Sequence, residues 1–120
     1  GGPTSASKLT FSAMPQLMGA EGWIVFQPNY RGSDNLGNAY QSAIVGDAGE
    51  GPGKDVMAGV AMLRAQPYVD KTRTAVTGWS YGGYMTSWLI GNYPNEWKAA
   101  MAGADLFPAG KRSGSAFLYS

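Results

Sequence analysis

Residues 76–88, VTGWSYGGYMTSW, place Ser80 two residues after Gly78 and two residues before Gly82. A β-branched run precedes this serine and an amphipathic pattern follows it, which predicts a strand that turns abruptly into a helix. In a G-x-S-x-G turn of this kind the glycines lack the Cβ atoms that would collide across the bend, and the serine is presented as a nucleophile. A Gly-rich turn can also contain a serine by chance, so the flanking strand and helix are what favour a nucleophile.

The composition limits how such a serine can be activated, because the 120 residues contain no histidine and no cysteine. Without cysteine there is no disulfide framework, no thiolate-bound zinc and no thiol catalysis, and we predict neither a metal nor another cofactor. The formal net charge is +1, and the 9 basic residues are spread along the chain. No nucleic-acid partner is therefore expected.

The chain lacks an apolar run of membrane-spanning length, and its start, GGPTSASK, lacks the basic-then-apolar order of a signal peptide. We therefore predict a soluble chain with no membrane partner, and we favour a cytoplasmic location. Charged residues make up 14% of the chain, against about 25% in an average domain. A surface so poor in charge favours self-association, so a homo-oligomer is expected.

Apolar runs alternate with helical patterns along the chain, which predicts one α/β domain with a parallel sheet. Residues 23–26, WIVF, form a continuous apolar run, as expected for a strand covered on both faces. Val56, Val60 and Leu63 share one stripe of a predicted helix. The expected elements are helix 8–20, strand 23–28, a short helix over 36–44, helix 55–66, strand 74–77, helix 83–91 and strand 99–102.

Three stretches carry a family resemblance: GWSYGGYM at 78–85, PNYRGS at 28–33 and GKDVMAGV at 53–60. Together they closely resemble the catalytic domain of the prolyl oligopeptidase family of serine peptidases, particularly its acylaminoacyl peptidase and dipeptidyl peptidase branches. The resemblance covers residues 1–105, and the tail 106–120 diverges from the family. It implies an α/β-hydrolase fold.

The same resemblance assigns an oxyanion hole around the nucleophile Ser80. In the family, the second glycine of an HGGP segment supplies one oxyanion-hole N–H, and the Gly-Gly-Pro start of this chain puts Gly2 in that place. The N–H of Tyr81, at the beginning of the predicted helix, is the second expected donor.

Two departures from the family pattern shape the expected fold. The family's catalytic aspartate and histidine lie well beyond the serine, whereas this chain continues for 40 residues after Ser80. The strand that ends in HGGP normally lies between strands 23–28 and 74–79, and here it is absent. We therefore expect a partial α/β-hydrolase fold: a short parallel sheet flanked by helices, lacking the later strands, in one truncated domain over 1–120. An excised fragment, a proteolytic remnant and a naturally shortened descendant all fit this expectation.

Asp105 follows the last predicted strand and is a candidate substitute base. Because the carboxyl ends of parallel strands meet at one edge of a sheet, we expect Asp105 and Ser80 to converge there. Tyr30 and Arg31, which follow another strand, are expected at the same edge. Asp105 can also be a solvated loop carboxylate, and Lys111 as the base of a Ser-Lys pair is a weaker alternative.

Other side chains near this edge have two interpretations each. Arg31 can clamp a substrate carboxylate or pair with Asp34 at the surface. Aromatic side chains can line an acyl pocket or pack in the core, and this set comprises Tyr30, Trp79, Tyr81, Tyr84 and Trp88.

Two functions from different classes follow from these residues. The first is a serine hydrolase that forms an acyl-enzyme on Ser80. With no imidazole to protonate a leaving amine, it is expected to be a minimal esterase on small or aryl esters rather than an efficient peptidase, so its partner is a small-molecule ester or peptide-like substrate. The second is a non-catalytic, oligomer-forming fragment of such a peptidase.

Overall fold

The parallel sheet expected from the sequence is present and short. The computed structural model describes residues 6–34 and 36–103. Within these ranges β1 and β2 pair in parallel, with Ala75 opposite Ala99 and Trp79 opposite Gly103, which confirms the α/β class. The elements in chain order are α1 (Ala13–Ala20), α2 (Asn38–Ser42), α3 (Glu50–Arg64), β1 (Ala75–Trp79), α4 (Tyr81–Asn92) and β2 (Ala99–Gly103).

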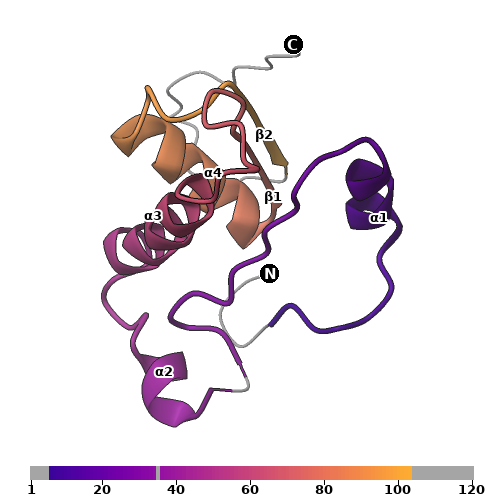
Figure 1. Ribbon diagram of the computed structural model, residues 1–120. Coiled ribbons are helices and arrows are strands. Elements are labelled where there is room, and N and C mark those ends of the chain that lie inside the picture. The colour runs from indigo at the N-terminus through magenta and orange to yellow at the C-terminus, as the bar shows by residue number, and fades with distance from the viewer. Residues whose placement is uncertain (1–5, 35, 104–120) are drawn as a thin grey trace.

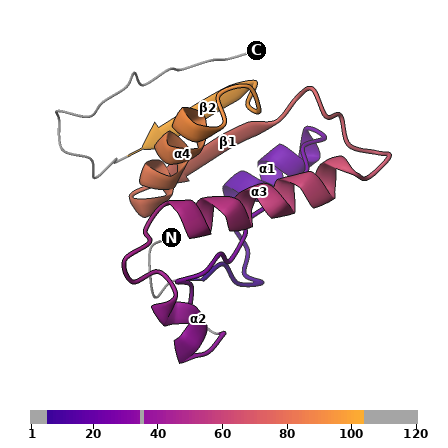
Figure 2. The same cartoon turned by 90° about the vertical axis from the view of Figure 1, so that its left-hand side faces the viewer.

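The helices lie on both sides of the sheet. Helices α3 and α4 cover one side and α1 lies on the other, as two views at right angles agree (Figure 1, Figure 2). In the described part of the chain, contacts between elements join α3, α4, β1 and β2, whereas α1 and α2 contact no other element. The hydrophobic core of the described residues comes from α3 and α4 alone, and its buried side chains are Val56, Val60, Met85 and Leu89.

Arg64 joins the end of α3 to the sheet. Its Nε donates to Thr74 Oγ1 at 3.2 Å, just before β1, and its Nη2 donates to the Glu96 carbonyl at 2.6 Å, just before β2. Its Nη1 also pairs with the Glu96 carboxylate. One guanidinium therefore holds a helix end and the approaches to both strands together.

Proline explains where two helices begin. Pro15 and Pro52 each occupy the third position of a helix, where the backbone N–H has no intrahelical acceptor and its loss costs nothing. As a result α1 begins at Ala13 rather than at residue 8, and α3 begins at Glu50, five residues before the predicted start at Asp55. Both predicted helices exist, with these starts corrected.

The prediction of a strand over 23–28 is wrong. Within the described residues, the backbone of residues 24–28 makes no hydrogen bond, so this extended segment has no strand partner. Its apolar side chains are partly exposed rather than covered on both faces, with Trp23 at 42% and Ile24 at 50%. The apolar run favours the extended conformation that this segment adopts, but a β-strand also requires a neighbouring strand with which to form hydrogen bonds.

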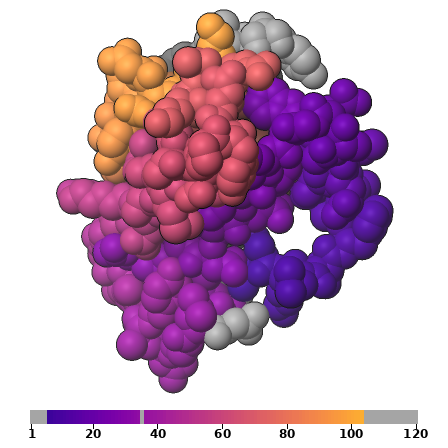
Figure 3. All heavy atoms as spheres, viewed as in Figure 1, coloured from indigo at the N-terminus to yellow at the C-terminus, as the bar shows by residue number. Residues whose placement is uncertain are grey.

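The N-terminal part of the described chain packs loosely. Helix α1 has no buried residue, and Figure 3 shows an opening between this segment and the rest of the molecule. Leu9 and Phe11, which precede the helix, are almost fully exposed. None of the helices in the described ranges is long and apolar enough to cross a membrane.

We predict that this exposed apolar surface makes the chain self-associate. Light scattering at micromolar concentration should give a mass above the 12.6 kDa of one chain. Met14 and Leu17 of α1 are 65% and 64% exposed, so the double variant Met14→Lys, Leu17→Glu should lower the mass and leave the unfolding temperature unchanged. A wild-type mass equal to that of one chain would contradict the prediction.

Candidate active site

Ser80 sits at the turn between β1 and α4 with a strained backbone. Its φ is 57° and its ψ is −118°, and it is the only non-glycine residue of the described ranges with positive φ. Such a conformation costs about 1–3 kcal/mol and persists only where the surroundings enforce it. The Ser80 N–H donates to the Gly103 carbonyl at 3.0 Å and its carbonyl accepts from the Tyr84 N–H at 3.1 Å. The side chain is left exposed, as a nucleophile requires.

Close backbone contacts enforce this turn. A Cβ on Gly78 would lie 2.2 Å from the Gly82 carbonyl oxygen, and a Cβ on Gly83 would lie 2.3 Å from the Gly103 carbonyl oxygen. The sequence-based explanation is therefore correct for Gly78 and wrong for Gly82, whose added Cβ would meet nothing within 4 Å. The second required glycine is Gly83, where α4 crosses β2.

The backbone N–H of Tyr81 is available as an anion donor. Tyr81 is the first residue of α4, so its N–H has no intrahelical acceptor, and no acceptor among the described residues takes it. The helix dipole adds partial positive charge at the same point. The other predicted oxyanion donor, Gly2, and the candidate bases Asp105 and Lys111 lie outside the described residues.

The Tyr81 side chain anchors the turn from the other side. Its hydroxyl donates to the Ala48 carbonyl, in the loop before α3, and its ring centroid lies 5.3 Å from that of Tyr84 and 6.2 Å from that of Tyr30. Burial is the main reason why the pKa of Tyr81 is raised, with the neighbouring tyrosines adding to it. The hydroxyl therefore keeps its proton, and this hydrogen bond, in alkaline solution. Sequence reasoning assigned the Tyr81 N–H to the oxyanion hole and its ring to an acyl pocket or the core, and it missed this hydroxyl contact.

The aromatic side chains divide into two groups. Tyr30, Tyr84 and Trp88 pack against the apolar core, and burial raises the pKa of Tyr30. Trp79 is 74% exposed, beside Ser80. Its ring lies over β2, because a Cβ on Gly103 would be 2.4 Å from the indole. Of these side chains, Trp79 has the most surface left for a ligand.

Arg31 pairs with Asp55 rather than with the predicted Asp34. Its backbone N–H and its Nε donate to Asp55 Oδ2 at 3.0 and 2.9 Å, and its Nη2 donates to Oδ1 at 2.8 Å. These hydrogen bonds hold the pKa of Asp55 below its ordinary value of 3.8. Nε and Nη2 of the guanidinium are thus both engaged by Asp55, and the loop that follows residues 24–28 is held against α3.

Sequence analysis missed the Arg31–Asp55 pair, although its two residues lie in the stretches PNYRGS and GKDVMAGV that carry the family resemblance. Asp55 was expected to begin a helix, but Asp47 takes a related role by accepting the Gly51 N–H at 2.9 Å at the start of α3. Within the described part of the chain, no three His, Cys, Asp or Glu residues cluster so that they could hold a metal ion.

The strained serine, its glycines and the helix N-terminus form a nucleophile elbow, and comparison with known proteins identifies its family. The family model described as "Prolyl oligopeptidase family" matches residues 9–108. The chain belongs to the prolyl oligopeptidase family. The family resemblance expected from the three stretches of sequence is thereby confirmed.

Relatives of this prolyl oligopeptidase family chain are named as peptidases. It is 38% identical over 102 residues to the uncharacterized peptidase YuxL of Bacillus subtilis and 34% identical over 109 residues to dipeptidyl-peptidase 5 of Porphyromonas gingivalis. These matches cover 84% and 89% of this chain, but only 15% and 16% of the relatives. The chain therefore spans about one sixth of the length of the relatives that it matches.

A solved structure from Bacteroides ovatus, named provisionally as a dipeptidyl aminopeptidase IV, has the same local fold. It superposes with a TM-score of 0.61 at 42% sequence identity, over 63% of this chain and 11% of that one. The partial α/β-hydrolase fold expected from the sequence is confirmed by this likeness together with the family match.

Gly78 and Gly82 provide a matched pair of alanine substitutions. We expect Gly78→Ala to lower the free energy of unfolding by about 3 kcal/mol or more, because its Cβ would overlap the Gly82 backbone. Gly82→Ala places its Cβ in open space on a helix, so it should leave stability unchanged or raise it by up to about 1 kcal/mol. Urea unfolding of both variants measures this, and equal losses would contradict the elbow geometry.

The Arg31–Asp55 pair should make stability depend on acidity. Because folding lowers the pKa of Asp55, the pair stabilises the fold above the unfolded-state pKa, and this contribution disappears as the pH falls through the folded-state pKa. Asp55→Asn should therefore destabilise the chain at neutral pH and differ less from wild type as the pH falls below 3.8. The exposed Asp34→Asn is the control and should behave as wild type in urea unfolding; a pH-independent deficit for Asp55→Asn would refute the pairing.

Proposed function

We propose that Ser80 is the acyl-accepting nucleophile of a serine hydrolase, and that the 120-residue chain by itself is a minimal esterase on small or aryl esters. The observation that supports this most directly is the backbone of Ser80: a φ of 57° at an exposed strand-to-helix turn, beside an N–H with no described acceptor. Strain of this kind is retained where it serves a function.

In the proposed reaction, Ser80 Oγ bonds to the acyl carbon of the ester while its proton passes to hydroxide or water. The carbonyl oxygen becomes an oxyanion that accepts a hydrogen bond from the Tyr81 N–H, and Gly2 is proposed as the second donor. The C–O bond to the alcohol then breaks and the alcohol leaves as an alkoxide or phenoxide. Water hydrolyses the acyl-serine, which releases the acid and restores Ser80.

The leaving group decides the choice between ester and amide. An aryl alcohol can leave as a stable anion, whereas an amine must be protonated as it leaves, which histidine does in a full triad. No histidine is present in the 120 residues. Serine hydrolases that lack triad residues still retain roughly 10³ to 10⁴-fold catalysis from the oxyanion hole and binding. Asp105 is proposed as an additional base.

Aromatic side chains support a preference for aryl groups. The exposed ring of Trp79 lies next to Ser80 in sequence and offers a face on which an aromatic acid or alcohol can stack. Tyr30 and Tyr84 are proposed at the edges of the same site, where they pack against the core and position the Tyr81 ring. Arg31 is proposed as a substrate contact only through Nη1, because its other guanidinium nitrogens hydrogen-bond to Asp55.

A peptidase is the second candidate, because the relatives named above are peptidases. It requires a histidine from outside these 120 residues. A third possibility is that the chain only binds and associates, as its exposed apolar surface favours.

An ester and an anilide with the same acyl group test the esterase proposal. We expect p-nitrophenyl acetate to be hydrolysed and the p-nitroanilide to remain intact, with a rate that climbs through about pH 9 because hydroxide activates the serine. The Ser80→Ala variant should lose the ester hydrolysis, and mass spectrometry should find an acetyl group on Ser80 in the wild-type chain.

Ser80→Thr is the matched control, since it keeps a hydroxyl but adds a methyl group at a positive φ that β-branched residues avoid. It should fold less stably and react more slowly. Equal rates for wild type and Ser80→Ala would exclude ester hydrolysis by these 120 residues alone, and comparable turnover of the anilide would show that they contain a general acid or base other than histidine.

A further inference from the structure

The loop before α3, residues 47–49, is hydrogen-bonded on both of its sides. On one side, Asp47 accepts the Gly51 N–H through Oδ1 at 3.1 Å and through Oδ2 at 2.9 Å, which bonds the loop to the first turn of α3. On the other side, the Ala48 carbonyl accepts a hydrogen bond from the Tyr81 hydroxyl, 33 positions further along the chain. The loop therefore links the start of α3 to the start of α4.

Close packing holds the same loop against α4. A Cβ on Gly49 would lie 2.6 Å from Trp88 Nε1 and 3.0 Å from the Tyr84 hydroxyl oxygen, so a side chain at this buried position would have to displace the indole ring. Tyr81, Tyr84 and Trp88 are spaced at i, i+3 and i+7 and share one face of α4. The Ala48 carbonyl thus has a fixed place opposite that face.

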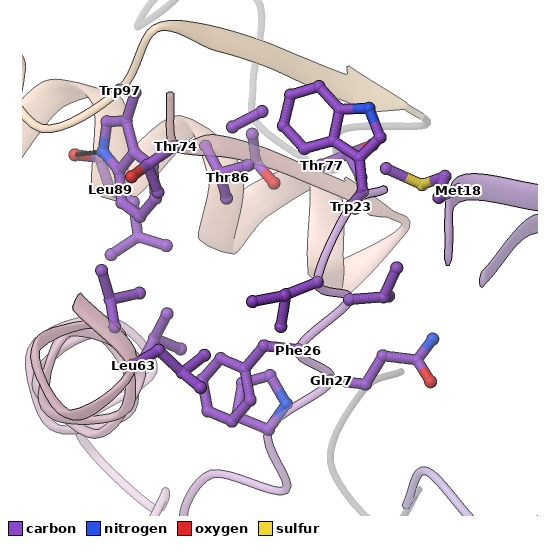
Figure 4. Close-up of a pocket in the computed structure, with 18 of the residues that line it drawn as sticks. Met18, Trp23, Phe26, Gln27, Leu63, Thr74, Thr77, Thr86, Leu89 and Trp97 are labelled. Atoms are coloured by element: carbon purple, nitrogen blue, oxygen red, sulfur yellow. Dashed lines mark hydrogen bonds between the residues drawn. The ribbon is translucent and has the colours of Figure 1, made fainter. Parts of the chain in front are cut away.

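The face of α4 that carries Tyr81 is distinct from the face that borders a large cavity. Figure 4 shows Thr86 and Leu89 of α4 beside this cavity, whose volume is about 600 Å³. Tyr81 does not line it. The contact between Tyr81 and Ala48 therefore does not depend on what fills the cavity.

The Tyr81 hydroxyl and the Tyr81 N–H belong to one residue whose movement is restricted. Its ring centroid lies 5.3 Å from that of Tyr84 and 6.2 Å from that of Tyr30, so a hydrogen bond at the far end of the ring also restrains the backbone. This backbone needs a restraint, because Ser80 before it has a φ of 57° and such strain persists only where the surroundings enforce it. A rotation of the first turn of α4 would move the N–H away from the developing oxyanion.

We propose that the Tyr81 hydroxyl is a positioning group of the hydrolase. Its hydrogen bond to the Ala48 carbonyl, in a loop that Asp47 holds, keeps the first turn of α4 in place and so directs the Tyr81 N–H at the oxyanion. This inference rests on the proposed function of Ser80, and it assigns no contact between the hydroxyl and the substrate. Burial raises the pKa of Tyr81, so the hydroxyl keeps its proton in the alkaline range where ester hydrolysis is expected to be fastest.

Tyr81→Phe tests the hydroxyl, because it retains the ring. With p-nitrophenyl acetate we expect kcat to fall about tenfold while KM changes by less than about twofold, since a displaced oxyanion donor weakens binding of the transition state and not of the ester. Tyr93→Phe is the matched control. Tyr93 packs against the same core from the other end of α4, and its hydroxyl makes no hydrogen bond among the described residues, so this variant should react as wild type does.

Asp47→Ala tests the loop from its other side. Asp47 makes no hydrogen bond to Ser80 or Tyr81 in the described part of the chain, yet its loss frees the loop from α3, so kcat should fall in the same way. Asp70→Ala is the control, because it removes a carboxylate that accepts the Thr72 N–H at 2.9 Å in another loop. In the double variant Tyr81→Phe, Asp47→Ala the two losses should not add, because both break the same link.

Hydrogen exchange tests the same link without any activity. The Tyr84 N–H donates to the Ser80 carbonyl at 3.1 Å in the first turn of α4, and it should exchange several-fold faster in Tyr81→Phe than in wild type. Circular dichroism checks that each variant folds; if Tyr81→Phe does not, the kcat of Asp47→Ala and its exchange rate at Tyr84 decide. A wild-type chain that hydrolyses no ester would reject the proposed function of Ser80, while the exchange rates still decide whether the hydroxyl holds this turn.

Four outcomes would overturn the inference. An unchanged kcat in Tyr81→Phe would show that the hydroxyl does not position the donor, and a raised KM with the same kcat would make it a substrate contact. A lower kcat without faster exchange at Tyr84 would exclude the first turn of α4 as the part that moves. Fully additive losses in the double variant would show that Asp47 and the hydroxyl act separately.

Discussion

The approach of Gly78 to the Gly82 carbonyl, closer than any Cβ would allow, is the constraint on which the site depends. It lets β1 turn into α4 within one residue and drives Ser80 into positive φ. The same turn leaves the Tyr81 N–H at a helix N-terminus, beside the exposed serine. A second close contact, between Gly83 and the Gly103 carbonyl, seats α4 on β2 and keeps this geometry from relaxing. Two glycines therefore create both the strain and the rigidity that maintains it.

Polar links stabilise this elbow where the core is too small to do so. Arg64, at the C-terminal end of α3, hydrogen-bonds to the residue before β1 and to the loop before β2. The Tyr81 hydroxyl links the elbow to the loop before α3. Arg31 and Asp55 attach the preceding loop to the same helix. Because each link joins segments far apart in sequence, a modest apolar core is sufficient to hold the site together.

The pattern of apolar, β-branched and glycine residues predicted the helices and strands that pack or pair with other elements of the described chain. The stripe of Val56 and Val60 marked α3, and the sequence around Ser80 marked the strand, the turn and the helix, because glycine and β-branched residues report backbone geometry directly. The same logic failed at 23–28, where an apolar run signals strand preference but cannot reveal whether a pairing partner exists. It also misassigned Gly82, since spacing identifies a glycine without showing which atoms approach it.

Side-chain partners were harder to foresee than elements. Arg31 was matched with Asp34, three residues away, when its partner is Asp55, across a loop and a helix turn. Nothing in a single sequence measures that distance in space. The predictions for Gly2, Asp105 and a single domain over 1–120 remain predictions, since the first two lie outside the described residues.

The concentration of contacts in α3, β1, α4 and β2 has a consequence for how the chain folds. Paired residues of the two strands are separated by 24 positions, as Ala75 and Ala99 show, so sheet and helix can form with little loop closure. The extended segment joins this unit through a few side chains and no ladder of backbone bonds. We therefore expect residues 50–103 to act as the folding nucleus, with residues 6–34 becoming ordered afterwards.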